Sequence, residues 1–123
     1  MRELRELLEP FGIETVSASE FNLPEPEETE PTFAGNARLK SVASATASGL
    51  AALSDDSGLC VVDLDGQPGI YSARWGGENK DFIMASERIK TELEAKNINP
   101  QGAAAYFICV LSLAQPDLSL IHI

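Results

Sequence analysis

The sequence has few basic residues and a large excess of acidic ones. Among its 123 residues, nine lysines and arginines stand against nineteen aspartates and glutamates, which gives a formal net charge of -10. A surface of that sign repels DNA and anionic lipid, so neither is expected as a partner bound over the surface. An anionic small molecule is not excluded, because a bound metal ion can invert the local field.

The chain also has only two cysteines, and no apolar run of membrane-spanning length. Cys60 and Cys109 lie in apolar runs outside any metal-ligand spacing, so both are expected to be buried free thiols in a reducing cytoplasm. No stretch reaches the ~18 apolar residues of a membrane helix, and no basic-then-apolar leader opens the chain. A Walker-type glycine-rich loop and a nucleophile triad are missing as well. We therefore expect a soluble cytoplasmic protein without a membrane or nucleic-acid partner.

What the chain does contain is enough apolar residue, 44%, for the core of one domain. Spacing and capping signals predict helices over residues 2–9, from an N-cap at Thr32 to Ser48, and from an N-cap at Asp81 onward. Short apolar runs predict strands at residues 13–16, 51–54, 59–64 and 103–114. The last run is so apolar that it is expected to be a central strand buried on both faces. The alternation of helices and strands predicts an α/β sheet.

Two of these helices have a candidate core face. In the second helix the expected apolar stripe is Leu39, Val42, Ala43 and Ala47. In the third it is Phe82, Ala85, Ile89 and Leu93. Residues 18–31, by contrast, hold five glutamates and three prolines, which predicts an extended acidic loop.

The segment from Leu53 to Leu59 places two adjacent acids, Asp55 and Asp56, between two expected strands. Neighbouring side chains of extended backbone point to opposite faces, so only one of the two acids can face a given pocket. Paired acids at a strand end suit a hard cation such as Mg²⁺, which takes one or two carboxylates and completes its shell with water and phosphate. Because Asp, Ser and Gly are also ordinary turn residues, a plain connection between strands is the alternative, and this short stretch taken alone favours it.

Other candidate residues have simpler explanations. Arg74 could bind phosphate through its planar fork, but a surface or interface ion pair is the favoured explanation. Lys40 is expected to be solvated, and Gly76-Gly77 to be a loop rather than a phosphate cradle. His122 is assigned no role.

Three motifs, taken together and in order, resemble one known family. They are Thr32-Phe33-Ala34-Gly35-Asn36-Ala37 followed by Lys40, then Ser54-Asp55-Asp56-Ser57-Gly58-Leu59, and then Pro68-Gly69-Ile70-Tyr71-Ser72-Ala73-Arg74-Trp75. Over residues 1–117 the chain is similar to the inosine triphosphate pyrophosphatases, also called dITP/XTP pyrophosphatases. The resemblance implies an elongated mixed sheet flanked by helices, with an active-site cleft between two lobes. It also implies Mg²⁺-dependent hydrolysis of ITP, dITP and XTP to a monophosphate and pyrophosphate, usually by a homodimer.

The resemblance also implies roles for individual residues. Asp56 matches the catalytic acid, described as proton acceptor and magnesium ligand, and Asp55 matches its acidic neighbour. Ser57 matches a substrate-contacting residue, and Phe33 and Asn36 match a helix start that faces the cleft.

The sequence departs from the family in three places. Gly35 stands where many members have a glutamate that helps to hold magnesium, so a neighbour must compensate or the affinity for metal drops. The opening strand with its TGN-x-x-K loop is missing, and so are the later GFGYDP and SHR segments. We therefore expect a chain truncated at both ends and inactive by itself, with residues 118–123 as a tail unlike the family. The alternatives are a non-catalytic nucleotide- or metal-binding remnant, a pyrophosphatase for modified pyrimidine nucleotides, and a purely structural subunit.

Overall fold

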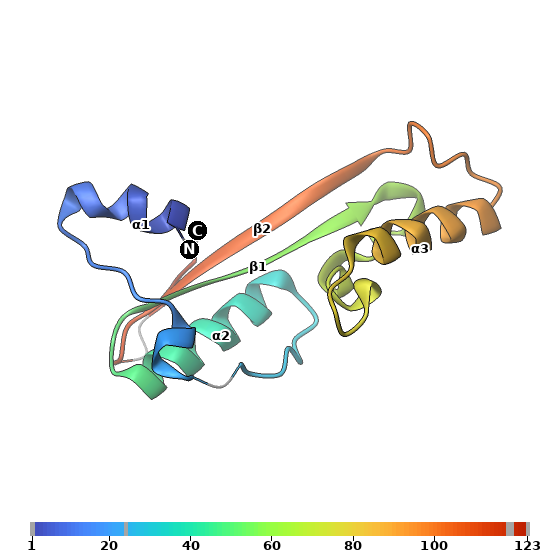
Figure 1. Cartoon of the computed structure of the whole chain (residues 1–123). Coiled ribbons are helices and arrows are strands. Elements are labelled where there is room, and N and C mark those ends of the chain that lie inside the picture. Colours follow the sequence, from blue (N-terminus) through green and yellow to red (C-terminus); the bar gives the residue numbers. More distant parts are fainter. Residues whose placement is uncertain (1, 24, 118–119, 123) are drawn as a thin grey trace.

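The computed structural model describes residues 2–23, 25–117 and 120–122. Its framework is a long antiparallel ribbon of two strands, with a short third strand beside the end of the second (Figure 1). The strands are β1 (Ala52–Val61), β2 (Ala105–Ala114) and β3 (Leu120–His122). The helices are α1 (Arg2–Leu8), α2 (Phe33–Ser48) and α3 (Phe82–Ala95), with 3-10 turns η1 (Glu9–Phe11), η2 (Ala18–Phe21), η3 (Val62–Leu64), η4 (Gly69–Tyr71) and η5 (Arg74–Gly76). Figure 1 shows α2 and α3 along opposite ends of the ribbon, so the chain has the expected mixed α/β fold.

β1 runs without a break where two separate strands were expected. Its ladder with β2 extends from Ala52 opposite Ala114 to Val61 opposite Ala105, with every residue between them paired. Asp, Ser and Gly favour turns, but the continuous ladder with the apolar β2 keeps them extended. The expected break was therefore wrong, and the acidic pair lies in the middle of a strand rather than in a connection.

The ends of α2 lie where the sequence predicted them. Thr32 is extended, and its Oγ1 accepts a hydrogen bond from the backbone N–H of Gly35 at 3.0 Å. At the other end Gly49 has a φ of 72° and leaves the helix in the left-handed region that glycine adopts without a steric penalty. Both capping predictions are confirmed.

The buried face of α2 differs from the predicted stripe. The residues that it buries are Asn36, Ala37, Ser41 and Ala45, whereas Ala47 is exposed and the other three stripe residues are only half-buried. Small side chains on this face let the helix approach the ribbon closely, and the Oγ atoms of Ser41 and Ser112 lie 2.8 Å apart with both residues fully buried. The stripe was wrong because close helix–sheet packing selected small residues over large apolar ones.

α3 covers the other end of the ribbon and encloses the main apolar core. Asp81 accepts hydrogen bonds from the backbone N–H groups of Ile83 at 2.9 Å and Met84 at 3.3 Å, which confirms the predicted N-cap. The core cluster consists of Val61, Leu64, Trp75, Ala85 and Leu93. Phe82 was expected to share this face, but it lies 82% exposed at the first helical position, beyond the edge of the core.

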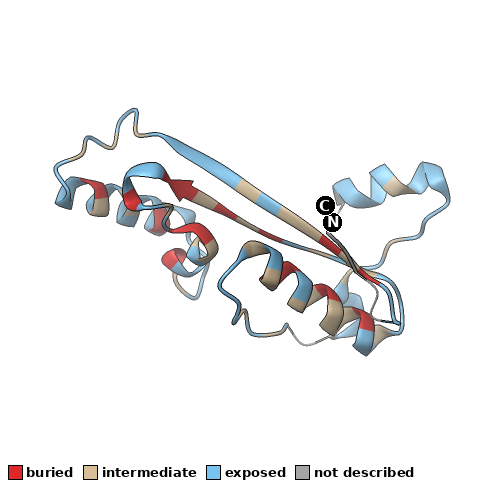
Figure 2. Cartoon of the chain, turned by 180° about the vertical axis from the view of Figure 1, so that it is seen from behind, coloured by how far each residue is buried: buried red, intermediate tan, exposed pale blue. Residues whose placement is uncertain are grey.

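β2 was expected to be buried on both faces, and over its first half it is not. Tyr106 is 51% exposed and Phe107 67%, and Cys109 is exposed, contrary to its expected burial. Among the described residues, only β1 pairs with residues 105–111, while α2 covers the other end of the strand, where Ser112 is buried. Figure 2 shows this change along the strand from exposed to buried.

Three further expectations concern the ends of the chain. Residues 13–16 form no strand, because no described strand pairs with them, and Thr15 is instead bonded to Arg5. The acidic stretch begins with the turn η2, and residues 25–30 form a loop without regular secondary structure. Of the predicted tail only residues 120–122 are described, and they form β3, while residues 118, 119 and 123 lie outside the described part. In the part of the chain that is described, no helix combines the length and the apolar character needed to cross a bilayer.

Candidate active site

Asp56 lies in the middle of β1 and faces α2. The side chains of β1 alternate in burial, and Asp56 is 6% exposed whereas its neighbour Asp55 is exposed. Strand alternation therefore separates the two acids, with Asp56 turned toward the helix and Asp55 toward the opposite face.

Lys40 lies between Asp56 and a second carboxylate, that of Glu28. The Nζ atom of Lys40, on α2, lies 3.7 Å from Asp56 Oδ1 and 3.2 Å from Glu28 Oε1. Lys40 is only 20% exposed, so the expectation that it is solvated was wrong. Glu28 was missed as a site residue, because one glutamate among four in the acidic loop (residues 25–31 as the structure describes it) has no distinguishing local pattern. For Lys40 a signal was available, because its spacing from Asn36 places both residues on one face of the helix.

The carboxylate of Asp56 is incompletely satisfied. Its Oδ2 atom is buried and has no hydrogen-bond partner among the described residues. Burial raises the pKa of Asp56 above its ordinary value, and the negative charge of Glu28 raises it further, while Lys40 and the Asn36 amide act in the opposite direction. A buried carboxylate oxygen without a donor is costly unless a cation or a proton meets it.

This arrangement fits a hard divalent cation. Asp56 Oδ2 and the carboxylate of Glu28 are oxygen donors of the kind that Mg²⁺ prefers, and both lie beside Lys40. No group of three or more acidic, histidine or cysteine side chains suitable for a metal occurs among the described residues. Such a sparse donor set suits Mg²⁺ better than a fully protein-ligated metal, because Mg²⁺ keeps several waters and takes phosphate oxygens from its substrate.

Gly35 is closely covered by the acidic loop. A Cβ atom built on Gly35 would lie 2.8 Å from the Cβ of Glu30 and 3.0 Å from the Oγ1 of Thr32. A longer side chain at this position therefore has no room unless Glu30 moves. The loop that takes this space also brings Glu28 to the site, so a neighbouring carboxylate is present where Gly35 supplies none.

Asp55 and Ser57 lie together on the opposite face of β1. The Oγ of Ser57 donates a hydrogen bond to Asp55 Oδ2 at 2.8 Å, and the pair is exposed. The structure thus joins these two predicted site residues to each other and places them away from the Lys40 side of the strand. Their metal-binding and substrate-binding roles stay predictions.

Asn36 and Phe33, on the first turns of α2, lie on the side of Asp56. Asn36 is 1% exposed, its Oδ1 accepts from the backbone N–H of Glu30 at 3.0 Å, and its Nδ2 donates to the Glu30 carbonyl at 3.2 Å. The ring of Phe33 packs against Gly58, where a Cβ atom would lie 3.0 Å from the Phe33 Cε1. Neither substrate-binding prediction is tested by these contacts.

Arg74 reaches the acidic loop from the other end of the ribbon. Its Nη2 donates to the carbonyl of Glu28 at 2.7 Å, and its guanidinium lies over the ring of Tyr71, 5.1 Å from the centroid. A hollow of about 320 Å³ adjoins this contact, with Arg74 and Lys80 as its cations and Glu25, Glu28 and Glu78 as its acids. Over the ranges that the structure describes, Arg74 therefore binds a backbone carbonyl and does not form the expected ion pair.

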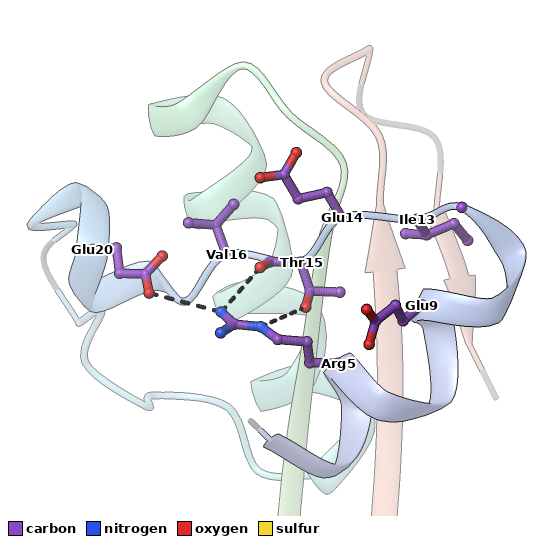
Figure 3. A pocket seen from close by; sticks show the side chains of 8 residues that line it. Arg5, Glu9, Ile13, Glu14, Thr15, Val16 and Glu20 are labelled. Atoms are coloured by element: carbon purple, nitrogen blue, oxygen red, sulfur yellow. Dashed lines mark hydrogen bonds and ion pairs between the residues drawn. The ribbon is translucent and has the colours of Figure 1, made fainter.

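A larger hollow, of about 500 Å³, lies elsewhere between α1 and the segment that follows it (Figure 3). Arg5 crosses it, donating to Thr15 Oγ1 at 3.3 Å and to the Thr15 carbonyl at 3.1 Å, and lies 3.8 Å from Glu20. Of the described residues that line this hollow, Arg5 is the one cation, and it is already engaged by these neighbours. The lining does not include Glu28, Lys40 or Asp56.

Comparison with known proteins points to a single family. The chain matches the Ham1 family over residues 1–123. It is 54% identical over 119 residues to the dITP/XTP pyrophosphatase of Ruegeria pomeroyi, and 57% identical over 117 residues to that of Rhodospirillum centenum. Each alignment covers 95% of this chain but only 58% and 57% of the relative, so the chain spans a little over half the length of these curated relatives.

Solved structures agree with the sequence comparison. A HAM1 protein from Coxiella burnetii superposes with a TM-score of 0.85 at 34% identity, covering 98% of this chain and 62% of that one. The Ham1 protein of Staphylococcus aureus gives 0.82 at 35% identity, covering 99% and 62%. The match of sequence and fold along the whole chain shows that the protein belongs to the Ham1 family.

Proposed function

We propose that this chain provides the metal- and phosphate-binding part of an enzyme that hydrolyses the non-standard purine nucleoside triphosphates ITP, dITP and XTP. The products are a nucleoside monophosphate and pyrophosphate, and the role is cleansing of the nucleotide pool. The names of the curated relatives support this reaction. The observation that carries the proposal is the buried Asp56 Oδ2, which has no hydrogen-bond partner within the described part of the chain and belongs to a carboxylate that lies 3.7 Å from Lys40 Nζ.

Mg²⁺ is the proposed cofactor, with Asp56 and Glu28 as the residues that would hold it. Both offer carboxylate oxygens at one place, and Glu28 makes up for the missing glutamate at position 35. Asp55 remains a predicted second ligand, although its exposed position makes Glu28 the better supported one. When bound, Mg²⁺ neutralises phosphate charge and lowers the pKa of a water molecule.

The protein's own side chains are assigned proton transfer, stabilisation of phosphate charge and substrate contact. Asp56, whose carboxylate lies beside Lys40, is the proposed acceptor of the proton from the water that attacks phosphorus. Lys40 supplies positive charge beside it for a phosphate oxygen. Ser57, Phe33 and Asn36 are the proposed substrate contacts.

The remaining parts of the proposal concern partners and location. A nucleoside triphosphate is the proposed partner, with no nucleic acid or membrane, and the net charge of -10 supports both exclusions. A homodimer in the full-length form and a cytoplasmic location are proposed from the resemblance to the pyrophosphatase family.

Because the chain spans 58% of the Ruegeria pomeroyi relative, the reaction is best tested in a chimera. In this chimera the chain replaces the segment of that relative to which it aligns over 119 residues. Pyrophosphate release with Mg²⁺ is measured with dITP, XTP, dATP and a modified pyrimidine triphosphate. We expect turnover of dITP and XTP, and a loss in kcat of about 10²–10⁴-fold for Asp56→Asn.

Asp63→Asn is the matched control, since Asp63 is an exposed acid in η3, outside the cluster. Unchanged kcat in Asp56→Asn would remove Asp56 from its proposed role. Preferred hydrolysis of the modified pyrimidine would assign the other pyrophosphatase class. Binding of dITP without hydrolysis would identify a non-catalytic remnant.

A further inference from the structure

The acidic loop has no regular secondary structure, yet the carboxylate of its Glu28 lies 3.2 Å from the Nζ of Lys40, which itself lies 3.7 Å from Asp56 Oδ1. A loop of mostly exposed residues does not hold a side chain in place unless something fixes its backbone. The fixing contact lies two residues further along, at Glu30.

The side-chain amide of Asn36 forms two hydrogen bonds with the backbone of Glu30. Its Oδ1 accepts from the Glu30 N–H at 3.0 Å, and its Nδ2 donates to the Glu30 carbonyl at 3.2 Å. The amide therefore pairs with the loop backbone as a neighbouring strand would. Among side chains of this size only asparagine has a donor and an acceptor on one planar group, since aspartate lacks the donor and leucine lacks both. Asn36 is 1% exposed and its two bonds to the exposed Glu30 are partly buried, which reduces competition from solvent.

A second contact holds the same loop from the opposite end of the ribbon. Arg74, on η5, donates to the carbonyl of Glu28 itself at 2.7 Å. The backbone around Glu28 is thus tied to α2 by Asn36 and to η5 by Arg74. These two elements lie under opposite ends of the ribbon (Figure 1).

We propose that Asn36 is a positioning residue, whose amide holds the loop backbone at Glu30 and thereby places the Glu28 carboxylate beside Lys40 and Asp56. This role differs from direct substrate contact, and it rests on the proposed metal site only for its effect on Mg²⁺. Groups that orient metal ligands typically contribute about 10–100-fold to metal affinity. Loss of the Asn36 amide is therefore expected to weaken Mg²⁺ binding although Asn36 supplies no ligand.

The test uses this chain, amide hydrogen exchange at Glu30, and titration with Mg²⁺ alone followed by NMR. Asn36→Leu should speed exchange of the Glu30 amide several-fold and weaken Mg²⁺ binding about tenfold or more. Glu28→Gln should weaken Mg²⁺ binding without changing exchange at Glu30. Ser41→Ala is the matched control, because Ser41 is equally buried on the same helix but bonds Ser112, so it should leave both readouts unchanged.

Unchanged Glu30 exchange in Asn36→Leu, or a loss of Mg²⁺ affinity no greater than in Ser41→Ala, would overturn the proposal. If Asn36→Leu fails to fold, the contact is tested in the unaltered chain by NMR. The measurement is the scalar coupling across the hydrogen bond from the Glu30 amide nitrogen to the Asn36 Cγ, and absence of this coupling would also overturn the proposal. If the unaltered chain binds no Mg²⁺, the proposed metal site fails, while the loop contact is still decided by the exchange and coupling measurements.

Discussion

At the scale of single residues, Asp56 combines burial with incomplete pairing. Its Oδ1 has a lysine at 3.7 Å, which is longer than a hydrogen bond, and its Oδ2 has no partner among the described residues. Lysine and the nearby amide of Asn36 do not outweigh desolvation and the charge of Glu28, so the net effect is a raised pKa. In the metal-free chain this residue therefore lowers stability at neutral pH.

The pH dependence of unfolding tests this. Because the pKa of Asp56 in the folded chain is raised above the ordinary value of 3.8, there is a pH range above 3.8 in which the folded chain keeps a proton that the unfolded chain has released. The free energy of unfolding then falls as pH rises from 3.8 through the raised pKa. Asp56→Asn removes this titration, so urea unfolding in metal-free buffer should show a higher midpoint than the parent at pH 7 and a flatter profile in that window.

Asp63→Asn, at an exposed acid, should leave the profile unchanged. A variant Asp56→Asn that is less stable than the parent at pH 7 would show that Lys40 compensates fully for burial.

Gly35 shows how a local preference can be overruled by a close contact. Alanine in a helix interior is normally more favourable than glycine by about 1 kcal/mol. Here the added Cβ atom would lie 2.8 Å from Glu30 Cβ, an atom too near the backbone to move cheaply, and overpacking of this kind costs roughly 1–3 kcal/mol. Gly35→Ala should therefore give no gain, or a net loss, in the free energy of unfolding measured with urea.

Ala34, which is exposed on the same helix turn, serves as the reference for the free-energy difference between alanine and glycine in this turn. Ala34→Gly should cost about 1 kcal/mol through propensity alone. A gain in Gly35→Ala as large as that cost would mean that the loop does not cover position 35.

At the scale of elements, the helices begin and end where short-range chemistry directs them. Thr32 and Asp81 bond the first free N–H groups of α2 and α3, and Gly49 provides the left-handed exit of α2. These interactions involve residues only two to four positions apart, so they could be predicted without knowledge of the fold.

The N-cap of α3 can be tested directly. Asp81→Ala removes the acceptor for the N–H groups of Ile83 and Met84 and should cost about 1 kcal/mol in urea unfolding. Asp81→Ser keeps an acceptor at the same position and should recover most of that loss. Equal losses in the two variants would contradict a capping role.

At the scale of the whole molecule, the ribbon is only partly covered. Ser112 and Ala114 of β2 are fully buried, but Tyr106 and Phe107 in its first half are exposed. None of the described residues pairs with the outer edge of β2 over residues 105–111, a run without a charged residue. A long, flat, apolar edge of this kind favours association.

We therefore expect the isolated chain to associate as its concentration rises, and Phe107→Lys to reduce that association by placing charge at the edge. Sedimentation velocity over a concentration series measures the effect. Phe82→Lys changes a phenylalanine that is 82% exposed but lies on α3, and it should have a much smaller effect. A parent chain that stays monomeric and melts cooperatively would contradict the expectation.

The sequence by itself determined the mixed α/β class, both ends of α2, the start of α3, and the alternation that separates Asp55 from Asp56. Each depends on residues a few positions apart, or on the two-residue period of a strand. The motif residues also sufficed to identify the family, because their order and spacing along the chain are independent of how it folds.

Only the tertiary structure decided which residues meet Asp56 and which parts of β2 are covered. Glu28, Lys40 and Asp56 come from a loop, a helix and a strand, and their proximity depends on how these elements pack. The same packing joined two expected strands into β1 and selected small residues for the buried face of α2. Burial and long-range pairing are properties of the assembled elements, so local patterns predict the elements but not the contacts between them.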